Sequence, residues 1–243
     1  MTAQRTTAPD DNLRLGRLSI IVPALNEAGS IVSFLQSVRE ACNQPAEIIV
    51  ADGGSDDATA ALASTFCDRV VTSARGRAIQ MNAGANVATG TILCFVHADS
   101  SLPPHADKHI RDALASGASK WGRFDVRLSG NAPALRIVER MMNWRSRLSG
   151  IATGDQAMFM TRTVFDKVGG YPDIALMEDV AMSRLLIAYS RPACLRQRLV
   201  TSSRRWEQQG ILRTILLMWK LRLLYFLGAD PARLAQSYYG RDI

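Results

Sequence analysis

The stretch Ile92–Ser100, ILCFVHADS, decides the fold of this 243-residue chain. Its first five residues, Ile92–Val96, are apolar and predict a buried strand that stops at His97-Ala98-Asp99. A core strand that ends in side chains able to bind a metal is typical of the ligand-binding edge of α/β proteins. An HxD triplet alone is more often a turn with a helix cap, so its meaning depends on the rest of the chain.

Three further strands precede this stretch, and a helix pattern follows each of them. They are predicted at Leu18–Val22, Ile48–Ala51 and Val70-Val71. Four strand-helix units in about 100 residues predict an α/β fold with a mostly parallel sheet and right-handed crossovers. Polar groups at the carboxyl ends of parallel strands meet at one edge. The groups expected there are Pro23–Glu27, Asp52–Asp57, Arg75–Arg77 and His97–Asp99. Such acidic groups and arginines suit a nucleotide or a phosphorylated ligand with a divalent cation.

The second half of the chain is less regular. It predicts strands at Trp121–Leu128 and Ala157–Met160 and helices at Ala134–Leu148 and Val180–Ala188. We expect one domain over residues 17–206, preceded by a disordered leader at residues 1–16. A C-terminal apolar and basic helical extension is predicted over residues 207–243.

Composition and charge limit the class of protein. A hydrophobic content of 47% and a charged content of 21% are ordinary for a globular protein. The cysteines lack CxxC spacing and the first residues lack an apolar signal segment, so we expect a cytoplasmic protein. The net charge of +7 is concentrated after Ala181, where 11 Lys and Arg face 3 Asp and Glu. This excess predicts an anionic partner, although a solvated basic face is also compatible with it. Nucleic acid is not expected, because the arginines alternate with aliphatic rather than aromatic residues.

The stretch Ile211–Leu227 is strongly apolar but carries Arg213, Lys220 and Arg222. Seventeen residues with three charges make a poor transmembrane span. In a helix Arg213 and Lys220 share a face and Arg222 points nearly opposite, which is not the pattern of a clean interfacial helix. Three uses stay open: packing on the main domain, docking to a partner subunit such as a second copy, and peripheral contact with an anionic membrane surface.

Five motifs occur in the order seen in family 2 glycosyltransferases. They are PALNE at Pro23–Glu27, VADGGSDDAT at Val50–Thr59, HADS at His97–Ser100, GGYP at Gly169–Pro172 and ED at Glu178-Asp179. The resemblance covers Leu18–Trp206 and implies the GT-A fold. It also implies metal-dependent, inverting transfer of a sugar from a nucleotide-diphosphate donor to a hydroxyl acceptor. HADS, RGRAIQMNAG at Arg75–Gly84 and SSRRW at Ser202–Trp206 resemble a small bacterial subgroup with a name linked to arsenosugar biosynthesis, which assigns no substrate.

The resemblance also implies roles for single residues. Asp179 would be the catalytic base, and Asp99 with His97 would hold Mn²⁺ or Mg²⁺. Donor and substrate contacts would come from Pro23, Glu27, Asp52, Arg77, Asp155, Glu178, Arg205 and Trp206. Helix capping, turn formation or a solvated charge is the plain structural alternative for several of these side chains.

Three positions depart from the family pattern. His97 stands where the family has an acidic residue, and a nitrogen ligand shifts the preference toward Mn²⁺. Gly53 replaces a residue that is often acidic, which weakens the assignment of UDP, although a UDP-sugar remains the favoured donor. Ser202 replaces the glutamine of QxxRW, which argues against a polymerising enzyme. The acceptor is not identified by the sequence, and a lipid-linked acceptor is compatible with it.

Two other functions stay open. One is a sugar nucleotidyltransferase, which would need a glycine-rich, lysine-bearing phosphate loop that does not follow Val22. The other is a membrane-associated scaffold of the same fold with weak or no turnover. A Rossmann dehydrogenase is disfavoured because no GxGxxG follows the first strand.

Overall fold

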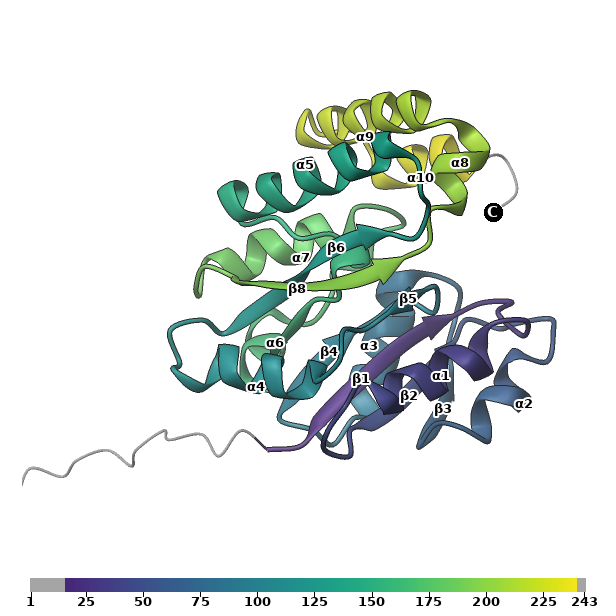
Figure 1. Cartoon of the computed structure of the whole chain (residues 1–243), viewed down its shortest axis with the longest axis vertical. Coiled ribbons are helices and arrows are strands. Elements are labelled where there is room, and N and C mark those ends of the chain that lie inside the picture. Colours follow the sequence, from purple (N-terminus) through teal and green to yellow (C-terminus); the bar gives the residue numbers. More distant parts are fainter. Residues whose placement is uncertain (1–15, 240–243) are drawn as a thin grey trace, which may run out of the picture.

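The computed structural model describes residues 16–239, which form one sheet with helices on both faces (Figure 1). Within these residues eight strands lie in the order β3-β2-β1-β4-β7-β6-β8-β5. The leader predicted for residues 1–16 lies outside the described residues, except for Gly16.

The elements have the following bounds. The strands are β1 (Leu18–Ala24), β2 (Glu47–Asp52), β3 (Arg69–Thr72), β4 (Ile92–Phe95), β5 (Ser100–Ser101), β6 (Trp121–Leu128), β7 (Phe159–Thr161) and β8 (Ala193–Thr201). The helices are α1 (Ile31–Glu40), α2 (Thr59–Ser64), α3 (Arg77–Val87), α4 (Ala106–Ala115), α5 (Pro133–Ser149), α6 (Arg162–Val168), α7 (Glu178–Ile187), α8 (Arg204–Gln209), α9 (Ile211–Phe226) and α10 (Pro231–Tyr239), with a 3-10 turn η1 (Gly154–Gln156).

The first half of the sheet is parallel, as the strand-helix pattern predicts. β1 pairs in parallel with β2 and with β4, and β2 pairs in parallel with β3. Every residue of β2 and β4 is buried, as expected for strands that helices cover on both sides. The α/β prediction is confirmed, and the carboxyl ends of β1 and β4 lie at one edge.

The complete sheet is mixed because the second half adds antiparallel pairs. β7 runs antiparallel to both β4 and β6, and β8 runs parallel to β6 and antiparallel to β5. The sequence prediction did not include β8. Arg196 and Arg198 are both exposed and interrupt its apolar pattern, beside a register shift opposite Phe124 and Asp125.

Two apolar clusters hold the helices to the sheet. One joins α1, α2 and α4 to β1, β2 and β4, and the other joins α3, α6 and α7 to the opposite face. Gly84 lets α3 approach β1 closely, because a Cβ at this position would lie 2.5 Å from Cγ2 of Ile21. This packing brings the N-terminus of α3, which begins with Arg77, near the carboxyl edge of the sheet.

The C-terminal helices pack on the rest of the chain. Leu221 of α9 and Leu234 of α10 are buried in a cluster with Leu176, Met177 and Val180. Packing on the main domain, one of the uses left open by the sequence, is therefore observed. The domain boundary after Trp206 falls inside α8 and stays a prediction. In the described part of the chain, no helix is long and apolar enough to cross a membrane.

Candidate active site

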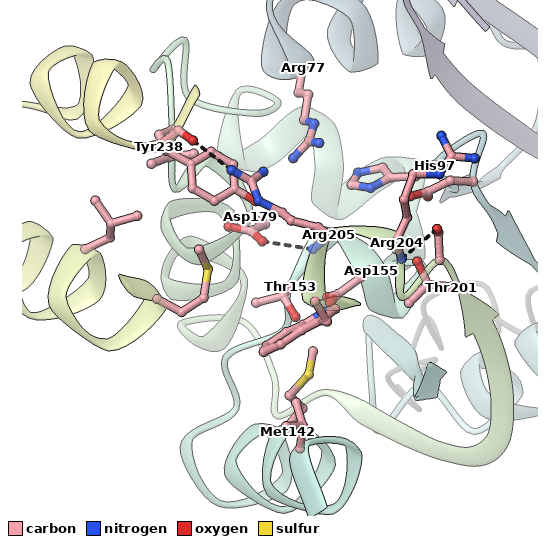
Figure 2. Close-up of a pocket in the computed structure, with 18 of the residues that line it drawn as sticks. Arg77, His97, Met142, Thr153, Asp155, Asp179, Thr201, Arg204, Arg205 and Tyr238 are labelled. Atoms are coloured by element: carbon pink, nitrogen blue, oxygen red, sulfur yellow. Dashed lines mark hydrogen bonds between the residues drawn. The ribbon is translucent and has the colours of Figure 1, made fainter. Parts of the chain in front are cut away.

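A cavity of about 1320 Å³ opens where β1, β4 and β8 end. The N-termini of α3, α7 and α8, the turn η1 and the helices α5 and α9 complete its walls, and Figure 2 shows its polar side chains. Nine of the predicted site residues line it: Glu27, Arg77, His97, Asp99, Asp155, Glu178, Asp179, Arg205 and Trp206. Residues far apart in the sequence thus converge at one edge of the sheet.

Pro23 and Asp52 are not among the residues that line this cavity. Pro23 lies within β1, opposite Ala51 of β2. Asp52 is 4% exposed, and its carboxylate accepts hydrogen bonds from the backbone of Gly54 (3.1 Å) and Ser55 (3.0 Å) and from the Ser55 hydroxyl (2.5 Å). The carboxylate therefore orders the loop after β2, and its contact with a donor base stays a prediction.

His97 and Asp99 lie in the turn after β4. The His97 ring packs on the backbone of Gly154, where a Cβ would lie 2.5 Å from Cε1 of the ring. Burial and the positive charge of Arg77 lower the pKa of His97 to about 3. The imidazole is therefore neutral and has a nitrogen lone pair available. Asp99 is exposed, and its carboxylate accepts a long hydrogen bond of 3.3 Å from the Ser100 hydroxyl.

These two side chains fit a divalent metal that phosphate oxygens also bind. Mg²⁺ and Mn²⁺ accept carboxylate oxygens, and Mn²⁺ also accepts imidazole nitrogen. Within residues 16–239, no group of three or more His, Cys, Asp or Glu side chains could hold a metal ion. His97 and Asp99 therefore suit a metal whose remaining ligands come from a phosphate-bearing substrate and water.

Glu178 and Asp179 form the first turn of α7. The Asp179 carboxylate accepts hydrogen bonds from the backbone of Gly154 (2.8 Å) and of Val180 (2.6 Å), which orient it at the cavity. Burial raises the pKa of Asp179, while these bonds and Arg77 act against the rise. Burial, followed by the charge of Asp179, raises the pKa of Glu178 to about 7. The two adjacent acids therefore bind protons more tightly than ordinary carboxylates do.

Arg77, the first residue of α3, is the cation that faces this acidic pair. Its guanidinium points into the cavity toward Asp179 (Figure 2). The Arg77 residue is solvent-exposed. Desolvation opposes its positive charge, but Tyr239, Glu178, Tyr238 and Asp179 raise the pKa of Arg77 above its ordinary value. Arg77 therefore stays charged and can neutralise an anion that enters the cavity.

Asp155 of η1 and Arg145 of α5 line the neighbouring part of the cavity. Burial raises the pKa of Asp155. Among the described residues, Oδ1 of Asp155 and both Nε and Nη2 of Arg145 are buried without a hydrogen-bond partner. Unpaired buried polar atoms cost about 1–3 kcal/mol each and are typical of functional sites. This pair is therefore suited to hold polar groups of a substrate.

Arg205 and Trp206 are the second and third residues of α8. The Arg205 guanidinium stacks on the Tyr238 ring, 3.5 Å from its centroid, and donates a hydrogen bond of 2.7 Å to the Tyr238 carbonyl oxygen. The helix α10 therefore holds Arg205 in position at the cavity. Trp206 lines the cavity and packs against the apolar cluster of Leu128, Leu135 and Val138.

The cavity lining also contains polar residues for which the sequence suggested no role, among them Arg145, Arg204, Arg222 and Tyr238. A signal existed for Arg222, because it points away from the face that Arg213 and Lys220 share. Arg145 is one of several arginines in α5, and nothing local distinguishes it. Tyr238 had no sequence signal, because its contact depends on α10 folding back over α8.

A mixed α/β sheet with this polar cavity at its carboxyl edge agrees with the GT-A fold that the motifs predict. The chain belongs to glycosyl transferase family 2, whose family model matches residues 19–168. The predicted family, fold and enzyme class are confirmed.

Solved structures show the same fold. The S. aureus TarS structure of residues 1–349 has a TM-score of 0.63 at 16% identity, over 82% of this chain and 64% of that chain. The mannosyltransferase PcManGT from Pyrobaculum calidifontis has a TM-score of 0.59 at 20% identity, over 99% of this chain and 68% of that chain. At these identities the likeness is one of fold.

A curated relative covers a shorter segment. The PGL/p-HBAD biosynthesis glycosyltransferase of Mycobacterium bovis is 38% identical over 92 residues, which are 35% of this chain and 36% of the relative. The Mycobacterium tuberculosis protein of the same name matches equally well. The match spans about a third of each relative.

Proposed function

We propose that the protein transfers a sugar, with inversion, from a nucleoside-diphosphate sugar to a hydroxyl acceptor, using a divalent metal ion. The observation that carries this proposal is the placement of Asp179. Its carboxylate is oriented by two backbone N–H groups in the same cavity as Arg77 and Arg205. A base for the acceptor and cations for a diphosphate therefore lie in one site.

Structures of similar fold support a nucleotide-sugar donor. TarS has been solved with UDP and with UDP-GlcNAc, and PcManGT with GDP-Man and Mn²⁺. A UDP-sugar is the donor that we propose for this chain. The loss of the QxxRW glutamine at Ser202 favours a single transfer over polymerisation.

The proposed reaction is a direct displacement. The acceptor oxygen bonds to the anomeric carbon and gives its proton to Asp179, while the bond from that carbon to the diphosphate breaks and its electron pair leaves with the diphosphate. Arg77 and Arg205 neutralise the charge that grows on the leaving group. A metal ion held by Asp99 and His97 would neutralise the diphosphate further. One displacement inverts the anomeric centre.

The environment of Asp179 suits a general base. Its raised pKa increases its affinity for the acceptor proton, and the two N–H groups with Arg77 favour the ionised form that must be present beforehand. Protonation of the Glu178–Asp179 pair is expected to stop transfer on the acidic side of the pH profile.

The remaining predicted residues are assigned by their place in the cavity. We assign Glu27 and Glu178 to the donor side, Asp155 to the acceptor side, and Trp206 to stacking on a sugar ring. Pro23 acts through the loop that follows β1, and Asp52 acts through the loop that follows β2. Arg145, which the sequence did not single out, is assigned to the acceptor side with Asp155.

The substitution Asp179→Asn tests the proposal. Release of UDP from UDP-sugars with Mn²⁺ should fall by roughly 10²–10⁴-fold, while binding of UDP and Mn²⁺ persists. GDP-mannose serves as the alternative donor. Asp173→Asn, at an exposed carboxylate outside the cavity, is the matched control. Full turnover by Asp179→Asn would exclude Asp179 as the catalytic base. A wild-type protein that is inactive with every donor would favour the alternative of a scaffold without turnover.

A further inference from the structure

The outer sides of α5 and α9 each carry a stripe of exposed apolar side chains. The stripes are Ile137, Met141, Trp144 and Leu148 on α5, and Leu212, Leu216, Trp219, Leu223 and Phe226 on α9. The three- and four-residue spacing places each set along one face of its helix. Their exposed fractions range from 46% at Met141 to 77% at Leu212. We call these nine residues the α5–α9 face, and a patch of this kind marks an interaction site.

The two stripes belong to neighbouring helices. Val138 and Met142 of α5 share an apolar cluster with Ile211 and Ile215 of α9. Both helices lie along the end of the molecule opposite β1, β2 and β3 (Figure 1). They therefore present one continuous surface.

The cavity opens at this surface. Trp144 of α5 and Trp219 of α9 both line it and are 67% and 58% exposed. The same helices contribute the apolar side chains of Met142, Ile215 and Met218 to the lining, together with Arg145 and Arg222. A ligand with an apolar part can therefore lie between the two helices while its polar end points toward Asp179.

The charges around the α5–α9 face have one sign. The two helices contain seven basic residues and a single acidic residue, Glu139, which is 6% exposed and accepts a hydrogen bond from the Leu128 backbone. Arg140, Arg213 and Lys220 are exposed beside the stripes. Arg222 lines the cavity instead, which explains why the basic residues of α9 do not share one face.

We propose that the α5–α9 face rests on an anionic lipid bilayer and that the acceptor is an amphiphile taken from that bilayer. The choice of acceptor rests on the proposed sugar transfer, whereas the membrane contact does not. Leucine side chains would enter the acyl boundary, tryptophan rings would lie at the headgroups, and the exposed basic residues would bind lipid phosphates.

A second copy of the chain fits this surface less well. A symmetric dimer through the α5–α9 face would bring the three exposed cations of one copy toward those of the other, without acidic partners on either helix. Like charges brought together at an interface oppose association. Lipid phosphates supply the opposite charge.

Vesicle co-sedimentation of the full chain tests the membrane contact. The wild-type protein should bind phosphatidylcholine vesicles that contain phosphatidylglycerol and bind pure phosphatidylcholine weakly. The triple variant Leu212→Gln, Leu216→Gln and Leu223→Gln changes exposed residues outside the cavity and should lower binding by about tenfold or more. Leu62→Gln, at an exposed leucine of α2, is its matched control.

A second variant tests the charges. Arg213→Gln with Lys220→Gln should weaken binding to phosphatidylglycerol vesicles by about tenfold or more, because each basic residue near an anionic surface contributes about 1 kcal/mol. Arg69→Gln with Lys167→Gln removes two exposed charges elsewhere and should leave binding unchanged.

The outcomes separate the two proposals. UDP release in vesicle-free solution should be equal in the wild type and the leucine triple variant, which shows that the fold and donor site are intact. Absence of vesicle binding by the wild type, or equal losses in the control variants, would overturn the membrane contact. A wild-type dimer that the triple variant dissociates, without vesicle binding, would also overturn it and assign the face to self-association. Vesicle binding by a wild-type protein that turns over no donor would support the contact and count against the transferase proposal.

Discussion

Replacing Glu178 with glutamine should stabilise the protein above neutral pH and have little effect near pH 5. Glu178 is 6% exposed, and burial, followed by the charge of Asp179, raises its pKa from the ordinary 4.5 to about 7. The folded state therefore binds this proton more tightly than the unfolded state. The resulting stability is present below about pH 4.5 and is lost as the pH rises through about 7. At about 1.4 kcal/mol per pKa unit, the loss approaches about 3 kcal/mol.

Urea unfolding at pH 5 and pH 8 measures this effect. At pH 8 the Glu178→Gln protein should have a free energy of unfolding about 3 kcal/mol above wild type, or a Tm higher by about 6–12 °C. At pH 5 most of that difference should vanish. Glu40→Gln, at an exposed residue that ends α1, is the control. Its difference from wild type in free energy of unfolding should be the same at both pH values. An equal effect of Glu178→Gln at both pH values would refute the explanation by buried charge.

Three other substitutions test the structure around the cavity. Gly154→Ala places a Cβ 2.5 Å from Cε1 of His97. This substitution should therefore cost about 1–3 kcal/mol of stability and reduce UDP release. Gly29→Ala is the control and should not destabilise the fold, because nothing lies within 4 Å of its Cβ. Asp99→Asn should raise the Mn²⁺ concentration for half-maximal UDP release by roughly tenfold or more, and unchanged Mn²⁺ dependence would exclude Asp99 as a ligand. Asp52→Asn weakens the bonds that order the β2 loop, so the free energy of unfolding should fall by about 1–3 kcal/mol. Loss of UDP affinity at unchanged stability would instead support a base contact.

Strands with a local apolar pattern were predictable. β1, β2 and β4 are short apolar runs closed by polar residues, and each lies where the pattern places it. β8 was missed because two exposed arginines, Arg196 and Arg198, interrupt its pattern. Its strand conformation depends on pairing with β6, about 70 residues earlier in the chain, and with β5. Contacts between residues so far apart in the sequence leave little pattern in a short stretch of residues.

Side-chain direction limited what could be predicted of the site. The motifs placed His97, Asp99 and Asp179 at one edge, because strand ends and helix starts fix those positions. They could not show that the Asp52 carboxylate turns back to its own loop. Nor could they show that Arg145 lies beside Asp155, since that contact depends on how α5 crosses the sheet.

The cavity combines charged and apolar side chains, and under the proposed function this mixture bears on how the two substrates enter. Arg77, Glu178 and Asp179 contribute charged groups, whereas Met142, Trp144, Ile215 and Trp219 contribute apolar surface. In that proposal the nucleotide-sugar, which is polar along its whole length, lies against the charged side chains. The proposed amphiphilic acceptor would then reach Asp179 from between α5 and α9, where its apolar part excludes water from the anomeric carbon. Under this proposal, UDP release in vesicle-free solution comes from water that enters in place of the acceptor, and an amphiphile that fills the space between α5 and α9 should suppress that hydrolysis.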